Sequence, residues 1–213
     1  MGDPVTGGEP GSSYRAWRDH YVAHFRERLE RYGEDVRVLW NSAASQRERF
    51  EVLVGVANLR GKSVLDVGCG FGDLVPYLRE RGIVVARYRG IDVVPEMVAI
   101  ARRRYPDMDF ACADLNNEAA EEPPCDVVLG SGLFFLPHPD WHRYMTASVE
   151  RMYAHCREAV AVNFLSVHSP RPDEQSIYAE PAEVLRGLQA AITPRVVLRH
   201  DYRLNDFTVY LYR

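Results

Sequence analysis

Two kinds of apolar spacing alternate along most of this chain. Short continuous apolar runs, such as the one in residues 125–129, predict strands that are buried on both faces. Stretches in which apolar residues recur every three or four positions, such as 94–105, predict amphipathic helices. The strands predicted in this way cover residues 63–67, 83–91, 108–111, 125–129 and 157–165. Strands that alternate with helices predict an α/β fold with a doubly wound, mostly parallel sheet.

The two ends of the chain carry different patterns. Residues 195–212 contain two apolar stretches joined by the turn-forming pair Asn205-Asp206, and the second stretch alternates with a period of two. This predicts a C-terminal antiparallel hairpin, which brings the sheet to seven strands. Near the N-terminus, aromatic residues recur at helical spacing over 14–32, and a capping-box spacing at Ser45 predicts the start of a second helix.

Composition and pattern divide the chain into three segments. Residues 1–13 are rich in Gly, Pro and Ser and are predicted to be a disordered tail. Residues 14–60 are predicted to form an N-terminal helical cap, and residues 61–213 the core of a single α/β domain. Within that core, the polar segment 166–180 is long enough to act as a lid.

The totals are those of an ordinary globular protein. The chain has 213 residues, of which 46% are apolar, so it can bury one sizeable core. Its net charge of −4 gives no basic field for nucleic acid. No apolar run resembles a leader or approaches membrane-spanning length, and the 4 cysteines form no paired motif. We therefore expect a cytoplasmic protein with no metal site and no disulfide.

A glycine-rich turn follows the first predicted strand. Gly68, Gly70 and Gly72 stand at alternate positions, and Asp66 precedes them. Glycine permits positive φ and lets a ligand approach the backbone. The helix predicted to follow Asp73, its expected N-cap, directs its N-terminus at the turn. The dinucleotide fingerprint G-x-G-x-x-G is not met, because Asp73 occupies the position of its third glycine.

The pattern D-x-G-x-G-x-G over residues 66–72 resembles the first motif of class I S-adenosylmethionine-dependent methyltransferases. These enzymes have a Rossmann-like seven-stranded sheet that ends in an antiparallel hairpin. The resemblance implies that Asp66 faces the ammonium of the cofactor. It implies that Asp92, at the end of the second predicted strand, accepts hydrogen bonds from the ribose hydroxyls. It also implies that Asp114 holds the adenine amino group while Leu115 covers the ring.

The resemblance also assigns candidate residues to two ligands. The cofactor is S-adenosyl-L-methionine, whose product is S-adenosyl-L-homocysteine, and its predicted contacts are Asp66, Gly68, Cys69, Gly70, Asp92, Val93, Met97, Asp114, Leu115, Ser131 and Arg49. The predicted contacts of the methyl acceptor are Tyr21, Trp40, Gly132, Phe134 and Asn163. Arg49 could reach the methionine carboxylate or an acidic acceptor. The alternative interpretation is that Arg49 is an exposed residue on a helix and contacts neither ligand.

The implied reaction is methyl transfer by in-line displacement to a small-molecule acceptor. The protein's main task is then to position the acceptor in a dry pocket. A general base is needed only if the nucleophile arrives protonated, and the candidates for catalytic roles are His138, His142, His168 and Asn163.

Other functions remain open at this point. The fold could serve a non-catalytic regulatory or scaffold protein that binds S-adenosylmethionine without turnover. A nicotinamide oxidoreductase is disfavoured by the missing third glycine and by the acids Asp66 and Asp114. Methylation of nucleic-acid bases is disfavoured because Gly130-Ser131-Gly132-Leu133 replaces the Asn/Asp-Pro-Pro-Tyr/Phe motif. We expect a small-molecule partner, no nucleic acid, no membrane, and a monomer or homodimer; the acceptor atom stays open among N, O, C and S.

Overall fold

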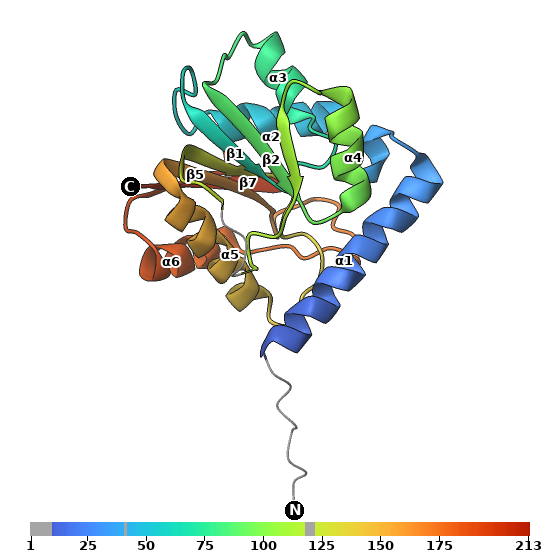
Figure 1. Ribbon diagram of the computed structural model, residues 1–213. Coiled ribbons are helices and arrows are strands. Elements are labelled where there is room, and N and C mark those ends of the chain that lie inside the picture. Colours follow the sequence, from blue (N-terminus) through green and yellow to red (C-terminus); the bar gives the residue numbers. More distant parts are fainter. Residues whose placement is uncertain (1–9, 41, 118–121) are drawn as a thin grey trace, which may run out of the picture.

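The computed structural model describes residues 10–40, 42–117 and 122–213 (Figure 1). The helices are α1 (Pro10–Tyr32), the 3₁₀-helix η1 (Val36–Val38), α2 (Ala43–Val54), α3 (Leu74–Glu80), α4 (Pro95–Arg104), α5 (Trp141–His155) and α6 (Pro181–Ala191). The strands are β1 (Ser63–Val67), β2 (Arg87–Asp92), β3 (Asp109–Cys112), β4 (Cys125–Gly130), β5 (Cys156–Leu165), β6 (Val196–Arg199) and β7 (Asp206–Tyr212).

The strands form one sheet in the order β3-β2-β1-β4-β5-β7-β6. Its pairs are parallel except for those of β7, which runs antiparallel to both β5 and β6. This confirms the predicted doubly wound sheet with a C-terminal hairpin. Because β7 is reversed, its first residue, Asp206, pairs with Leu165 at the end of β5. The start of β7 therefore lies at the same edge as the carboxyl ends of the parallel strands.

Helices cover both faces of the sheet, which explains the continuous apolar runs. Helices α2, α3 and α4 pack on one face with Val127 and Leu129 of β4. Helices α5 and α6 pack on the other face with Val128 (Figure 1). These three neighbours on β4 are all fully buried. Burial of a side chain of this size stabilises a fold by roughly 1.5–3 kcal/mol. Successive residues of a strand point to opposite faces, so strands such as β1 and β4 contribute buried side chains to the apolar clusters on both faces.

Helix α1 lies outside the apolar clusters on the two faces of the sheet and crosses the edge where the parallel strands end (Figure 1). Its buried residue Phe25 belongs to a third apolar cluster with Phe71, Met97 and Leu136. The helix ends at Gly33, which has φ of 61° and donates its N–H to the carbonyl of Leu29.

The predicted boundary of the tail differs from the structure. α1 begins at Pro10, so it takes in the last four residues assigned to the tail, 10–13. Residues 1–9 of that predicted tail lie outside the described residues.

Two predicted caps are wrong in their details. α2 begins at Ala43, because its N-cap is Ser42, three residues before the expected Ser45, and the Ser42 side chain accepts the N–H of Ser45. Asp73 does stand at the N-cap position of α3, but its side chain makes no capping hydrogen bond. Its carboxylate instead accepts from the amide of Gln46, at 2.8 Å, and faces Arg104. Asp73 therefore ties α2 to the glycine turn.

Two strand boundaries also differ from the prediction. β2 begins at Arg87, because residues 83–86 form a connection in which Val84 is exposed. The predicted tight turn at Asn205-Asp206 is wrong, because residues 200–205 connect the two strands and Asp206 is the first residue of β7.

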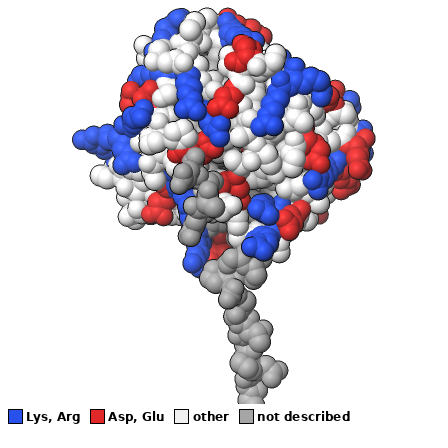
Figure 2. All heavy atoms as spheres, in the orientation of Figure 1, with Lys and Arg blue, Asp and Glu red and all other residues white. Residues whose placement is uncertain are grey.

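Basic and acidic side chains are interspersed over the face seen in Figure 2. Among the described residues, charged side chains form ion pairs between neighbouring elements, such as Arg26 with Glu96 and Arg79 with Asp107. Among the described residues, no helix is long and apolar enough to cross a membrane.

Candidate functional site

The glycine turn takes a backbone shape that side chains resist. Gly68, Gly70 and Gly72 have φ of 69°, 53° and 77°, in the left-handed region that favours glycine. The N–H groups of Gly68 and Cys69 both donate to the carbonyl of Ile91, at 2.8 and 3.0 Å. A Cβ on Gly68 would lie only 2.4 Å from the side chain of Leu133. The turn is therefore held against β2, and the side chain of Leu133 occupies the space that a Cβ at Gly68 would need.

Asp92 ends β2 directly beside this turn. Its side chain is buried, with 6% of its surface exposed, and accepts the N–H groups of Gly70 and Val94, each at 2.9 Å. Burial raises the pKa of its carboxyl, and these backbone hydrogen bonds oppose that rise. Each carboxylate oxygen can accept more than one hydrogen bond, so capacity remains for a ligand hydroxyl.

Asp66, near the end of β1, is held in a different way. The hydroxyl of Tyr88 donates to it at 2.6 Å, deep in the sheet. Burial raises the pKa of the Asp66 carboxyl to about 7, even though the Tyr88 hydrogen bond favours the charged form. Its charge therefore changes close to neutral pH.

Asp114 follows β3 and is contacted by α1. The hydroxyl of Tyr14 lies 2.8 Å from both carboxylate oxygens, and the N–H of Asn116 donates at 2.9 Å. Burial and the Asp114 charge raise the pKa of the Tyr14 hydroxyl, so it stays protonated as a donor. Arg18, one turn further along α1, lies 3.9 Å from the same carboxylate. The N-terminal helix thus reaches the third acid of the predicted site.

Two adjoining cavities lie along this edge of the sheet. Cavity A has a volume of about 260 Å³ and cavity B of about 60 Å³. They share Tyr21, Gly68, Asp92 and Phe134, so the glycine turn and Asp92 stand between them. The other predicted residues that line cavity A are Trp40, Arg49, Asp66, Cys69, Met97, Ser131, Gly132 and Asn163. Those that line cavity B are Val93, Asp114 and Leu115.

Gly70 and the three predicted histidines line neither cavity. Gly70 contributes its N–H to Asp92 instead. His138 stacks on Tyr144, with ring centroids 4.7 Å apart, and accepts the N–H of Asp140. His142 packs beside Trp141, and His168 lies beside His200. This geometry gives none of the three a direct route to a ligand in cavity A.

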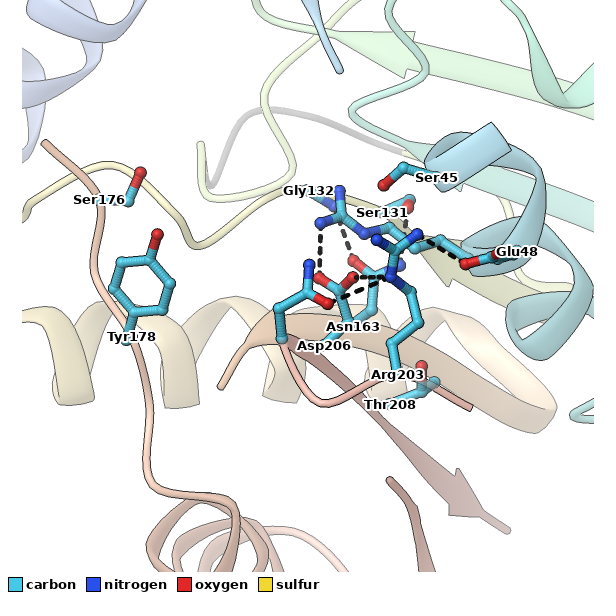
Figure 3. Close-up of polar contacts among 12 residues, drawn as sticks. Ser45, Glu48, Ser131, Gly132, Asn163, Ser176, Tyr178, Arg203, Asp206 and Thr208 are labelled. Atoms are coloured by element: carbon cyan, nitrogen blue, oxygen red, sulfur yellow. Dashed lines mark hydrogen bonds and ion pairs between the residues drawn. The ribbon is translucent and has the colours of Figure 1, made fainter. Parts of the chain in front are cut away.

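Asn163, near the end of β5, fixes the loop that follows β4 (Figure 3). Its carbonyl oxygen accepts the N–H of Gly132 at 2.9 Å, and its amide nitrogen donates to the hydroxyl of Ser131 at 2.7 Å. Both ends of the side chain are therefore engaged by this loop, which positions Ser131 and Gly132 at cavity A.

Arg49 joins an ion-pair network at the wall of cavity A. Its guanidinium donates to Asp206 at 2.5 Å and stacks over the ring of Trp40 at 4.8 Å. Asp206 is 1% exposed and also faces Arg203, which in turn pairs with Glu48 (Figure 3). The helix α2 is thereby linked to the start of β7, and Arg49 is not the exposed arginine of the alternative reading.

Several residues of cavity A were not predicted. They include His24 and Arg28 from α1, Asn205 and Asp206 before and in β7, and Ser169, Arg171, Asp173, Gln175, Ser176 and Tyr178 from the segment 166–180. Figure 3 places Ser176 and Tyr178 across from the network around Asp206. The length and polarity of that segment carried a signal, whereas His24 and Arg28, one turn apart on α1, are not among the aromatic residues whose spacing predicted the helix.

The residues present fit a nucleoside that carries an amino-acid tail. Cavity B lies between two acids, Asp92 and Asp114, which suit ribose hydroxyls and an exocyclic amine. Cavity A begins at Asp66 and the glycine turn, which suit a cationic tail. Within the described residues, no three His, Cys, Asp or Glu side chains are grouped so as to hold a metal ion.

Comparison with known proteins agrees with this geometry. The family model described as a methyltransferase domain matches residues 64–159. Protein Rv1506c of Mycobacterium tuberculosis (strain ATCC 25618 / H37Rv), which carries the name of a methyltransferase, is 31% identical over 156 residues, or 69% of this chain and 90% of that protein. The trans-aconitate 2-methyltransferase of Escherichia coli O139:H28 is 35% identical over 96 residues, which are 45% of this chain and only 38% of that enzyme.

The fold is also found among solved structures. Magnesium protoporphyrin IX methyltransferase from Synechocystis PCC 6803, with bound S-adenosylmethionine, superposes with a TM-score of 0.66. The match covers 99% of this chain and 100% of that one at 16% sequence identity, so the likeness is one of fold.

Proposed function

The chain belongs to the class I S-adenosylmethionine-dependent methyltransferases, and from that premise we propose that it methylates a small-molecule acceptor bound in cavity A. The single observation that supports this proposal most strongly is the placement of Asp92 and the glycine turn between two cavities. One cavity suits the nucleoside and the other leaves space beyond it for a second molecule. Ligands of open α/β sheets bind at this edge.

We assign the cofactor contacts as follows. Asp92 accepts the ribose hydroxyls, Asp114 accepts the adenine amino group, and Asp66 faces the ammonium of the methionine portion. The remaining proposed contacts are those predicted from the sequence, with Gly70 acting through the Asp92 carboxylate that its N–H holds. S-adenosylmethionine, when bound, supplies an electrophilic methyl group.

The protein's own part is to hold and enclose the acceptor. Tyr21, Trp40 and Phe134 line cavity A with aromatic surface, which excludes water. The loop fixed by Asn163 presents Ser131 and Gly132 to the same space. Positioning of two reactants in this way can contribute roughly 7–11 kcal/mol to lowering the barrier.

The small-molecule class of the acceptor is supported by the volume of cavity A, about 260 Å³. The Synechocystis relative in fold acts on a porphyrin, and the Escherichia coli relative in sequence on trans-aconitate. The oligomeric state, monomer or homodimer, stays a prediction.

The test is binding of S-adenosylhomocysteine to the wild-type protein and to Asp92→Ala. We expect the variant to bind more weakly by about 1.5–3 kcal/mol, because it loses hydrogen bonds from two hydroxyls to a charged acceptor. Calorimetry measures both affinities, and thermal unfolding of the variant checks that loss of the Gly70 and Val94 contacts has not unfolded the turn.

NAD serves as the control ligand in this titration. Tight binding of NAD together with no binding of S-adenosylhomocysteine would contradict the proposal. Transfer of label from methyl-tritiated S-adenosylmethionine to a metabolite extract separates an enzyme from the regulatory or scaffold alternative, which predicts binding without transfer.

A further inference from the structure

Cavity A contains two cationic side chains that have no acidic partner among the described residues. These are Arg28, from α1, and Arg171, from the segment 166–180. They come from different elements and line the same space. Most other arginines in the described part of the chain face a carboxylate, as the pairs of Arg26, Arg79 and Arg203 illustrate.

Arg28 is half-buried and held by the backbone. Its guanidinium donates to the carbonyl of Val38 at 2.7 Å and to the carbonyl of Arg37. These contacts engage Nε and Nη2 and leave Nη1 without a hydrogen-bond partner in the described structure. Because carbonyl groups carry no net charge, the positive charge of Arg28 is not neutralised. Burial and this neighbouring charge lower the pKa of His24, one turn earlier on the same helix.

Arg171 is exposed at the wall of cavity A. Its backbone N–H donates to the hydroxyl of Ser169, but its side chain has no hydrogen bond or ion pair among the described residues. The acid nearest to it in sequence, Asp173, is already bound by the hydroxyls of Tyr178 and Ser176 and by the N–H of Gln175. The guanidinium is thus free to bind a ligand.

The acids that line cavity A are, by contrast, already partnered. They are Asp66, Asp73, Asp92, Asp173 and Asp206, and each accepts at least one hydrogen bond from a neighbouring side chain or backbone group. Two of them, Asp66 and Asp92, belong to the proposed cofactor contacts. The charged hydrogen-bond donors that remain for an acceptor are therefore those of Arg28 and Arg171.

We propose that the methyl acceptor is an organic anion, a molecule with a carboxylate or phosphate group that Arg28 and Arg171 bind. The inference rests on the proposed function, because it names the class of molecule methylated there. Guanidinium groups pair with planar oxyanions through two parallel hydrogen bonds, so arginine suits this task better than a point charge.

An anionic oxygen that accepts the methyl group would need no general base. This agrees with the position of His138, His142 and His168 outside both cavities. His24 does line cavity A, and its Nε2 is buried without a hydrogen-bond partner in the described structure. A neutral hydroxyl acceptor would instead need a general base in cavity A. His24 is the residue that could serve as that base if the acceptor is not an anion.

The experiment compares four probes of similar shape and different charge. Benzoate, phenyl phosphate, benzyl alcohol and benzylamine are each titrated by calorimetry into protein saturated with S-adenosylhomocysteine, so that only the acceptor space is open. We expect the two anions to bind roughly tenfold or more tightly than the alcohol and the amine, as charge-assisted hydrogen bonds predict. Benzoate and phenyl phosphate separate the carboxylate from the phosphate class.

Arg171→Gln is the first variant, because this side chain has no hydrogen bond or ion pair to lose within the described structure. It should weaken anion binding roughly tenfold and leave benzyl alcohol unchanged, and Arg171→Lys should restore part of the loss. Arg28→Gln should act in the same direction. The matched control is Arg186→Gln, an exposed arginine on α6 away from both cavities, which should bind every probe as the wild type does.

The outcomes distinguish the two levels of the proposal. Failure of the wild-type protein to bind S-adenosylhomocysteine would contradict the proposed function itself. Binding of that nucleoside with benzylamine or benzyl alcohol preferred over the anions would overturn only the acceptor class. The acceptor class would also fall if Arg171→Gln left the anion affinities unchanged.

Discussion

Burial leaves the charge of Asp66 sensitive to pH near neutrality. The carboxyl has a pKa of about 7 in the free protein. The ammonium that it is proposed to face favours the ionised form, so the pKa falls when the cofactor binds. Binding is therefore coupled to loss of a proton from Asp66.

We expect the affinity for S-adenosylhomocysteine to rise between pH 5.5 and 7 and to level off above about 7. The slope cannot exceed roughly tenfold per pH unit for a single proton. Calorimetry at four pH values measures it. Asp66→Asn should bind more weakly and flatten the profile, whereas an equally steep profile in that variant would assign the proton to another group.

The acids of the cofactor half were predictable from the sequence because each follows its strand directly. Asp66, Asp92 and Asp114 stand at or near the ends of β1, β2 and β3, and parallel strands bring such ends to one edge. Asp206 was missed for the opposite reason. It begins a strand, and only the reversed direction of β7 brings it to that edge.

At the scale of the element, α1 is an addition whose face forms walls of both cavities. Its residues Tyr14 and Trp17 line cavity B, whereas His24 and Arg28 line cavity A. The aromatic periodicity predicted the helix correctly, since spacing alone defines an amphipathic face. Spacing could not say what that face covers, because the partner surface comes from loops distant in sequence, such as the one that accepts the Trp17 N–H at Pro137.

A chain that begins at Glu34 should still unfold cooperatively, because the two main core clusters contain no α1 residue. It should bind S-adenosylhomocysteine at least roughly tenfold more weakly, since the wall above Asp114 is gone. Thermal unfolding and calorimetry measure the two effects. Undiminished affinity would show that α1 takes no part in the cofactor site.

A chain that begins at Leu59 provides the contrasting truncation. It removes α2, whose Leu53 is fully buried in a main cluster, and should therefore lose cooperative unfolding altogether. The segment 14–60, predicted as one helical cap, therefore contains helices with different roles: α1 covers the cavities, and α2 belongs to the core.

At the scale of the whole molecule, the pair of Arg49 and Asp206 connects the N-terminal helices to the last strand. Arg49→Gln would leave the buried Asp206 with one charged partner, Arg203, at 3.5 Å. Removing one partner of a buried pair costs about 3–5 kcal/mol, and we expect the lower end of that range because Arg203 remains. In a chain of this size we expect the melting temperature to fall by roughly 6 °C or more.

The matched control lies on the same helix. Arg47→Gln breaks an exposed ion pair with Glu80 and should leave the melting temperature nearly unchanged. Equal melting temperatures for the two variants would mean that the Arg49 pair does not join the two ends of the fold. The local sequence predicted α2 and the C-terminal hairpin separately. It could not predict the pairing of Arg49 with Asp206, because these residues are 157 positions apart.

The length of α1 has a consequence for the order in which ligands bind. Residues 12–32 contain neither proline nor glycine, so nothing in this stretch interrupts the helix. Tyr14 at one cavity and Arg28 at the other are about 21 Å apart along its axis. If the first reactant to bind orders this helix, we expect the second to bind more tightly than it would alone, because part of the ordering cost has been met. Thermodynamic linkage would then require the gain to be the same in either order of binding.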